Sequence, residues 1–158
     1  MRSGYFQVAM AEADRDKTAF ISHRGLHRYR VMPMGLKNAP STFQRLMDLV
    51  LSGLLYEACL VYLDDIIIFS RTLPEHLQRV EMVLERLSSA GLKLKPSKCQ
   101  FLQVKAGFLG HVVSADGIAT DPEKTEAISQ WPTPRNVHEI RMFFGNLQVL
   151  SAVRGSIC

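Results

Sequence analysis

The chain has few cysteines, and they form no recognisable pattern. Its three cysteines, Cys59, Cys99 and Cys158, lie far apart and are odd in number, and no CxxC pair occurs. This spacing gives no support for a disulfide framework or a zinc knuckle. We therefore expect reduced thiols, as is usual for an intracellular protein.

Long apolar stretches are also missing. No apolar run approaches the roughly 18 residues of a membrane-spanning helix. The opening residues, MRSGYFQVAM, lack the apolar core of a signal peptide. We expect no membrane partner and no targeting signal, with a location in the cytoplasm or the nucleus. Nothing in the sequence indicates an oligomeric state.

The bulk composition is that of a globular protein with a basic surface. The chain has 158 residues, of which 47% are hydrophobic and 22% charged, enough for the core of one domain or of a piece of a larger protein. Its formal net charge is +4 and its pI is about 9.1. This balance favours a polyanionic partner such as nucleic acid, although a basic surface without such a partner fits the charge equally well.

The order of the predicted elements is that of an α+β protein. Two β-prone runs, 17–22 and 27–32, flank Gly25 and predict a hairpin. Capping boxes are predicted for Ser41 with Gln44 and for Asn136 with Glu139. Periodicity and turn residues further predict helices at 41–54, 74–90, 122–130 and 137–146, and strands at 59–63, 66–70, 92–94, 99–104 and 108–114. The hairpins could pair into one antiparallel sheet covered by two helices.

Two adjacent aspartates interrupt an apolar run, VYLDDIIIFS at 61–70. A buried carboxylate costs several kcal/mol unless it is paired, so Asp64 and Asp65 are expected at the tip of a hairpin, facing an open space. Carboxylate oxygens at such a tip suit Mg²⁺, which takes one or two carboxylates together with substrate phosphates. A solvated Asp-Asp turn between two buried strands is the alternative.

The residues around this turn resemble those of one enzyme family. YLDD followed by an apolar run resembles the polymerase signature of reverse transcriptases, in particular those of gypsy-class long-terminal-repeat retrotransposons and, more loosely, retroviral polymerases. The resemblance covers about residues 2–146. It rests on segments in the family's order: RSGYFQ (2–7), KTAF (17–20), VMPMGLKNAPSTFQRLMD (31–48), YLDDIIIFS (62–70), HLQRVEMVLERLSSAGLKLKPSKCQF (76–101), FLGHVVSADGI (108–118) and WPTPRNVHEIRMFFG (131–145).

The resemblance implies an RNA-directed DNA polymerase that uses two Mg²⁺ or Mn²⁺ ions, a primer–template of RNA or DNA, and deoxynucleoside triphosphates. Asp64 and Asp65 would be catalytic and metal-binding, and Lys98 would lie near the position that protonates pyrophosphate. Substrate contacts are implied for ten further residues: Ser3, Gly4, Tyr5, Met34, Gly35, Tyr62, Leu63, Phe108, Leu109 and Gly110.

Among these, Tyr5 matches the aromatic gate against a 2′-hydroxyl, and Ser3 and Gly4 lie where backbone amides meet the triphosphate. The segment 108–110 matches the primer grip. Each residue also has a plainer interpretation. Tyr5 and 108–110 could simply pack, Gly35 could serve a turn, and Lys98 could be a solvated charge.

The resemblance also implies a division of the chain and a departure from the family. Residues 1–118 correspond to a palm with partial fingers, 119–146 to the start of a thumb or connection segment, and 147–158 to a tail unlike the family. The family has Asp-Leu before RSGY, and Met1 takes the position of that Leu. The missing Asp is the carboxylate that bridges both metals in the family.

Other acids that follow Tyr5, namely Glu12, Asp14 and Asp16, fall in a variable turn of the family and are poor substitutes. We therefore expect a fragment, incomplete at both ends, that does not catalyse synthesis by itself. A non-catalytic nucleic-acid-binding remnant and a non-functional retroelement relic are the alternatives.

Overall fold

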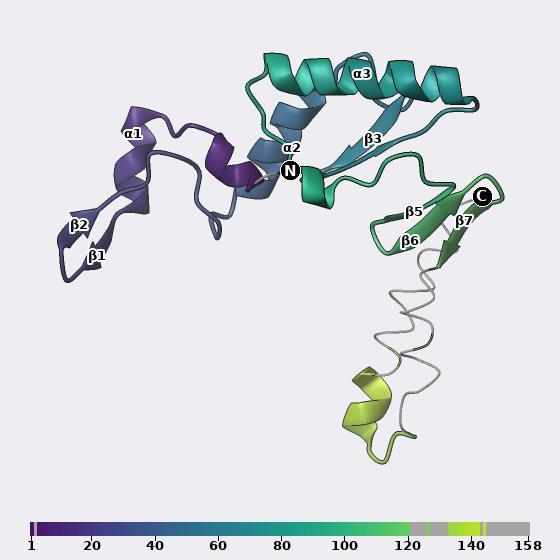
Figure 1. Cartoon of the computed structure of the whole chain (residues 1–158). Helices are drawn as coiled ribbons and strands as arrows, with labels where there is room; N and C mark the ends of the chain where they lie inside the picture. The colour runs from purple at the N-terminus through teal and green to yellow at the C-terminus, as the bar shows by residue number, and fades with distance from the viewer. Residues whose placement is uncertain (2, 121–125, 127–132, 143, 145–158) are drawn as a thin grey trace. The chain divides into compact units, whose positions relative to one another are not determined.

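The computed structural model describes every residue except 2, 121–125, 127–132, 143 and 145–158 (Figure 1). The chain divides into two compact units, Met1–Gln100 and Phe101–Cys158. The predicted functional boundaries at residues 118 and 146 stay predictions. Within the described part of the chain, no helix is both long enough and apolar enough to cross a bilayer.

The first unit begins with short elements that lead into a hairpin. These are η1 (Gly4–Gln7), α1 (Glu12–Arg15), η2 (Asp16–Thr18), β1 (Phe20–Ser22) and β2 (Gly25–His27). The predicted hairpin forms, with strands shorter than expected, and pairs Phe20 with His27 and Ser22 with Gly25. Gly25 has φ +104°, which a residue with a side chain rarely adopts. An isolated bridge between Ala9 and Val31 closes the segment, which we call the arm (residues 8–31).

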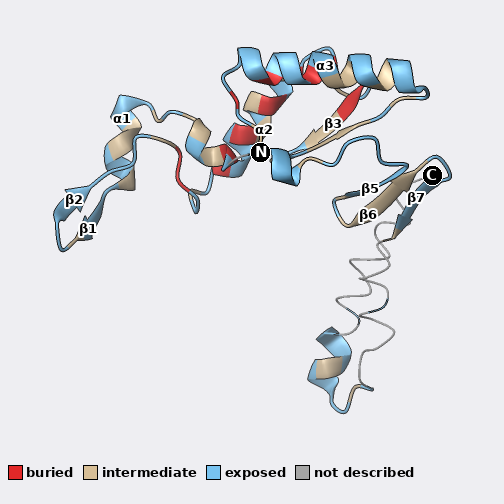
Figure 2. Ribbon diagram, viewed as in Figure 1, coloured by how far each residue is buried: buried red, intermediate tan, exposed pale blue. Residues whose placement is uncertain are grey.

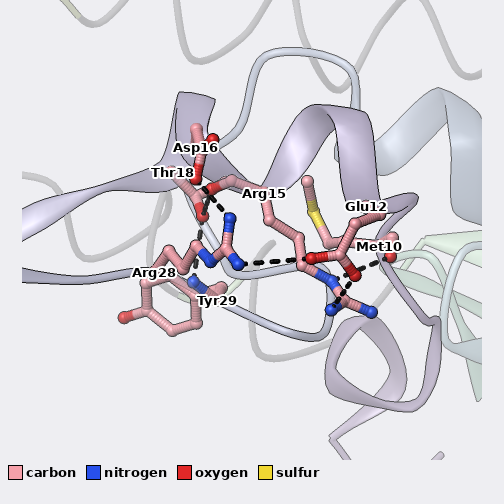
Figure 3. Close-up of polar contacts among 7 residues, drawn as sticks. All are labelled: Met10, Glu12, Arg15, Asp16, Thr18, Arg28 and Tyr29. Atoms are coloured by element: carbon pink, nitrogen blue, oxygen red, sulfur yellow. Dashed lines mark hydrogen bonds and ion pairs between the residues drawn. The ribbon is translucent and has the colours of Figure 1, made fainter.

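Arg28 holds the arm together through two carboxylates (Figure 3). Its Nη1 donates to Asp16 Oδ1 at 2.5 Å and its Nη2 to Glu12 Oε1 at 3.2 Å. The hydrogen bond to Asp16 raises the pKa of Arg28 above its usual value. Glu12 also pairs with Arg15, and Asp14 with Lys17. The three acids of this turn are therefore all engaged with basic side chains.

The core of the first unit lies between two helices and one hairpin. α2 (Ala39–Val50) packs against β3 (Cys59–Tyr62), and α3 (Leu73–Ser89) packs against β4 (Asp65–Ile68). Figure 2 shows the buried residues on α2, α3 and β3. The buried hydrophobic residues are Met32, Ala39, Phe43, Met47, Leu51, Leu54, Ala58, Cys59, Val83, Leu87 and Leu92. Each large side chain among them contributes about 1.5–3 kcal/mol by its burial.

The helix ends partly follow the prediction. α3 begins with the N-cap Thr72, whose Oγ1 accepts a hydrogen bond from Glu75 N. The predicted capping box of Ser41 and Gln44 is wrong. α2 begins at Ala39 with Asn38 at the N-cap position, and the Ser41 hydroxyl donates to the Asn38 carbonyl. Pro40 favours this earlier start, because proline suits the first turn of a helix.

The second unit is described mainly by a three-stranded antiparallel sheet. Its strands are β5 (Lys105–Phe108), β6 (His111–Ser114) and β7 (Gly117–Thr120), in the order β5-β6-β7. The single strand predicted at 108–114 is wrong, because the chain turns at Leu109 and Gly110, whose φ values are +51° and +77°. Positive φ at both central residues is typical of a tight hairpin.

Further predictions can be compared only in part. The predicted start of the last helix is confirmed, because Asn136 and Glu139 cap each other and residues 137–142 are helical. The strands predicted at 92–94 and 99–104 do not form. Leu92 N bonds back to Leu87 O at the end of α3, and the 3-10 turn η3 (Pro96–Lys98) follows. The predicted helix at 122–130 lies almost entirely outside the described residues, and the tail at 147–158 lies wholly outside them.

The expectation of one antiparallel sheet is wrong for the described residues. The strands form three separate sheets, β1-β2, β3-β4 and β5-β6-β7. Each hairpin pairs locally. The β3-β4 hairpin packs against α2 and α3, the β1-β2 hairpin is largely exposed, and β6 is half-buried. The α+β class itself, with antiparallel strands and helices packed on the central hairpin, is confirmed.

Candidate active site

The two aspartates lie at the tip of the β3-β4 hairpin, one residue away from the expected register. β3 ends at Tyr62 and β4 begins at Asp65, and these two residues pair across the strands. The connecting loop is therefore Leu63 and Asp64, not the two aspartates. Leu63 has φ +51°, a left-handed conformation that costs energy for a residue with a side chain. The turn is tight, and contacts from outside it hold it in place.

The carboxylate of Asp64 is partly buried beside Gly4. Its Oδ1 is buried and has no hydrogen-bond partner there. Gly4 makes room for it: a Cβ at position 4 would overlap Asp64 Oδ1 and would lie 2.9 Å from Phe43 Cζ. A buried carboxylate oxygen without a donor is costly, so this atom is a candidate ligand for a cation. Asp65, by contrast, is exposed.

Gln44 on α2 contacts the turn directly, and the sequence analysis missed this role. Its Oε1 accepts from Leu63 N at 2.7 Å, and its Nε2 donates to Val61 O at 3.4 Å and to Asp48 Oδ1 at 2.9 Å. The sequence holds no signal for this role, because a glutamine on an amphipathic helix is ordinary until its neighbours in the fold are known.

The segment that precedes the arm packs under the turn. Tyr5 meets Phe43 edge to face, with ring centroids 5.4 Å apart and an interplanar angle of 79°. The amino group of Met1 donates to the backbone oxygen of Asp64 at 3.3 Å. Ser3 is exposed, with φ +50°, and its carbonyl accepts from Phe6 N. The structure thus places Gly4 against the carboxylate of the aspartate turn and packs the ring of Tyr5 against Phe43.

A pocket of about 400 Å³ brings two predicted site residues together. Ser3 and Lys98 both line it, along with Met1, Leu94, Lys95 and Pro96. Next to the pocket, Gln7 joins the two segments that line it, because its side chain accepts from Lys93 N at 2.6 Å and donates to Lys93 O at 3.1 Å. Lys95 and Lys98 are exposed and give this pocket positive charge.

Other predicted residues of the first unit lie on exposed positions. Tyr62 is 54% exposed at the end of β3. Met34 is 66% exposed in the loop before α2, and Gly35 follows it with φ +89°. That φ explains the glycine by turn geometry alone.

The predicted primer-grip residues belong to the second unit. Phe108 ends β5 and pairs with His111, while Leu109 and Gly110 form the tight turn between β5 and β6. Leu109 is 47% exposed. The segment is therefore a hairpin tip and not the interior of a strand.

The donor set around the turn fits a divalent cation only in part. Asp64 and Asp65 supply carboxylate oxygens, the ligand type that Mg²⁺ and Mn²⁺ prefer, and one of these oxygens is buried without a partner. Among the described residues, however, no group of three or more His, Cys, Asp or Glu side chains gathers where it could hold a metal ion. The residues fit two ligands of a metal site.

Comparison with known proteins identifies the family. A family model described as "Reverse transcriptase (RNA-dependent DNA polymerase)" matches residues 1–113, which include the aspartate turn, the pocket and all but the last residue of the β5-β6 hairpin.

Curated relatives come from mobile elements. The chain is 49% identical over 145 residues to the retrovirus-related Pol polyprotein from transposon 297 of Drosophila melanogaster, and 40% identical to that from transposon gypsy. It is 33% identical over 150 residues to the transposon Tf2-3 polyprotein of Schizosaccharomyces pombe. The matches cover 92–95% of this chain but only 11–14% of those polyproteins.

Solved structures show the same fold. The foamy viral protease-reverse transcriptase in complex with dsDNA aligns with a TM-score of 0.83 and 25% identity, over 92% of this chain and 30% of that one. The same viral protein in complex with an RNA/DNA hybrid aligns with a TM-score of 0.78 and 26% identity, over 90% of this chain and 19% of that one. The match confirms the expected polymerase fold, and the chain belongs to the reverse transcriptase family, as found in the Pol polyproteins of gypsy-type retrotransposons.

Proposed function

We propose that this chain supplies the metal-binding turn and part of the nucleotide site of a reverse transcriptase. The reaction is template-directed DNA synthesis on an RNA or DNA template, with a primer and deoxynucleoside triphosphates as substrates. The observation that carries the proposal is the buried, unpartnered Oδ1 of Asp64, in the turn that bears the family's sequence.

Asp64 and Asp65 are the proposed ligands for Mg²⁺ or Mn²⁺. A bound divalent cation would act as a Lewis acid on phosphoryl oxygens and favour ionisation of the primer hydroxyl. What this chain contributes is orientation, since Gly4 leaves space for one carboxylate and Gln44 holds the backbone between the two strands. A bound cation would supply the partner that Asp64 Oδ1 lacks among the described residues.

The pocket beside Ser3 is the proposed site for the phosphates of the incoming nucleotide. Lys95 and Lys98 give it positive charge, which suits a triphosphate, and Lys98 is the proposed donor of a proton to pyrophosphate. Tyr5 is the proposed gate against a 2′-hydroxyl, and it is held by its edge contact with Phe43.

The remaining contacts are proposed from the family resemblance. Met34, Gly35, Tyr62 and Leu63 would face nucleotide or primer, and residues 108–110 would grip the primer strand. Their positions in the loop before α2 and at two hairpin tips leave them accessible for such contacts.

We further propose that the 158-residue chain does not extend a primer by itself. Two-metal transfer requires several carboxylates close together, and among the described residues no three or more His, Cys, Asp or Glu side chains gather at one place. The expected property is weak binding of a divalent ion without turnover.

A titration of the purified chain with Mn²⁺, followed by thermal unfolding, tests the metal proposal. Stabilisation that grows with Mn²⁺ is expected for the unmodified chain, because a ligand that binds only the folded state shifts the transition. Asp64→Asn is expected to abolish the shift, whereas Asp116→Asn, an exposed aspartate at the β6-β7 turn, is expected to retain it. An equal shift in all three chains would contradict the proposal, and extension of a primed RNA template would contradict the proposed inactivity.

Binding of nucleic acid without catalysis is the second candidate function. The foamy viral relatives were solved with dsDNA and with an RNA/DNA hybrid, and this chain has a net charge of +4. Lys95 and Lys98, together with exposed Arg45 and Lys93, are the proposed phosphate contacts. Affinity for an RNA/DNA hybrid is expected to fall steeply with salt, because each phosphate contact releases counterions. Affinity that does not change between about 50 mM and 200 mM salt would count against it.

A further inference from the structure

We propose that Gln44 and Asp48 form a relay that fixes the backbone of the aspartate turn, which makes Gln44 a positioning residue for the two carboxylates. The inference rests on the proposed metal-binding role of Asp64 and Asp65. It assigns a function to two side chains of α2 that would otherwise be ordinary polar residues on the helix surface.

The contacts of Gln44 reach the turn from one side. Its Oε1 accepts from Leu63 N at 2.7 Å, directly before Asp64, and its Nε2 lies 3.4 Å from Val61 O in β3. Leu63 N–H belongs to the two-residue loop, where the ladder of the hairpin supplies no acceptor. Gln44 therefore supplies the partner that this loop amide needs.

The turn needs such a partner because its backbone is unfavourable. Leu63 adopts φ +51°, a conformation that residues with a side chain avoid unless their surroundings impose it. If the φ of Leu63 relaxed to a negative value, the backbone would enter Asp64 from a different direction. The hydrogen bond from α2 thus decides where the carboxylate of Asp64 points.

Asp48 determines which end of the Gln44 amide faces the turn. An ionised carboxylate and a backbone carbonyl only accept hydrogen bonds, so Asp48 Oδ1 and Val61 O both require the NH₂ end of the amide. The oxygen of the amide is then left for Leu63 N–H. Asp48 and Gln44 are four residues apart on one helix, the spacing at which side chains meet.

The relay predicts what happens when hydrogen-bond donors and acceptors are exchanged at positions 44 and 48. In Gln44→Glu the side chain keeps its length but loses its NH₂ group, so it faces two acceptors and is expected to turn away. Adding Asp48→Asn supplies an NH₂ group at position 48 that can donate to the carboxylate introduced at position 44. The double variant is therefore expected to regain part of the protection of the Leu63 amide that the single variant loses.

Amide hydrogen exchange at Leu63 in the metal-free chain tests the contact itself. Gln44→Met, which keeps the side-chain volume, is expected to speed exchange at Leu63 about three- to tenfold relative to Leu60 and Ile67, as for the loss of one hydrogen bond. Gln44→Glu is expected to speed exchange at Leu63 to a similar extent. The double variant, Gln44→Glu with Asp48→Asn, is expected to bring the exchange rate back toward that of the unmodified chain. Gln78→Met, an exposed position of α3, is the matched control and is expected to leave Leu63 unchanged.

Binding of Mn²⁺, measured by electron paramagnetic resonance, tests the positioning role. Gln44→Met is expected to weaken Mn²⁺ binding by about three- to tenfold, in step with Leu63 exchange. Unchanged exchange at Leu63 would overturn the relay even if the unmodified chain binds Mn²⁺. Exchange that responds to Gln44 in a chain that binds no Mn²⁺ would overturn the metal proposal and with it the positioning role, while leaving the contact established. Faster exchange without weaker Mn²⁺ binding would also overturn the positioning role.

Discussion

A single methyl group at position 4 would disturb the site more than most larger substitutions elsewhere. In Gly4→Ala the new Cβ would overlap Asp64 Oδ1 and crowd Phe43. Overpacking of this kind costs about 1–3 kcal/mol, so the urea midpoint is expected to fall and the response to Mn²⁺ to disappear.

Gly107→Ala is the matched control for this substitution, because a Cβ there meets nothing within 4 Å and its φ is not in the left-handed range. Its unfolding midpoint is expected to stay within error of the unmodified chain, or to rise slightly. Equal stability of the two variants would show that the Asp64 side chain moves aside at no cost.

The identities of the site residues differ in how far the sequence could reveal them. Asp64 and Asp65 were evident, because two charges inside an apolar run need an explanation. Gln44 was not, because a glutamine on an amphipathic helix is ordinary until the segment opposite it is known. The register of the turn was also missed by one residue, since only backbone geometry shows that Asp65 begins β4.

At the scale of elements, the start of α3 carries a pH-sensitive contact. Glu75 accepts a hydrogen bond from Arg71 N at 3.0 Å, and this bond, aided by the charge of Arg79, lowers the pKa of Glu75 below its usual 4.5. A carboxyl with a lower pKa in the folded state stabilises the fold above its unfolded pKa. That contribution is lost as the pH falls from about 4.5 through the folded pKa.

Glu75→Gln is therefore expected to flatten the decline of the urea midpoint as the pH falls below about 4.5, because the variant has no carboxyl to protonate there. Glu85→Gln, an exposed carboxylate of the same helix, provides the comparison and is expected to leave the decline unaltered. A slope that Glu75→Gln does not change would show that other acids govern the acid sensitivity of the first unit.

The elements themselves were predicted well where one local signal dominates. The periodic apolar positions of α2 and α3 and the Asp-Asp hairpin gave elements within a few residues of those observed. Residues 92–94 and 99–104 look β-prone, but strand formation depends on a partner, and local hydrogen bonds at the end of α3 prevail there. The segment predicted as one strand at 108–114 is divided between β5 and β6 by the turn at Leu109.

At the scale of the whole molecule, the core is confined to one part of the chain. Every buried hydrophobic residue among those described lies between Met32 and Leu92, inside the unit Met1–Gln100. A chain that ends at Gln100 is therefore expected to unfold cooperatively, with a urea midpoint close to that of the full chain. Circular dichroism in the far ultraviolet, followed through a urea titration, measures both the cooperativity and the midpoint.

A gradual, non-cooperative transition in the shortened chain would show that the first unit depends on residues after Gln100. If the full chain also lacks a cooperative transition, the proposed site does not form and the interpretation of the chain as a relic gains support. The fold class was predictable from the alternation of hairpins and helices, whereas the separation into three sheets was not, because pairing between distant strands leaves no local trace in the sequence.

The hydrogen bond between the amino group of Met1 and the backbone of Asp64 has a practical consequence for anyone who purifies this protein. Residues added before Met1, such as a purification tag, would lie beside the aspartate turn, because Met1 N is 3.3 Å from Asp64 O. A polyhistidine tag would also bring imidazoles close to the carboxylates and bind the added metal itself. Affinity handles belong at the carboxyl terminus, and an amino-terminal one should be cleaved before any metal is titrated.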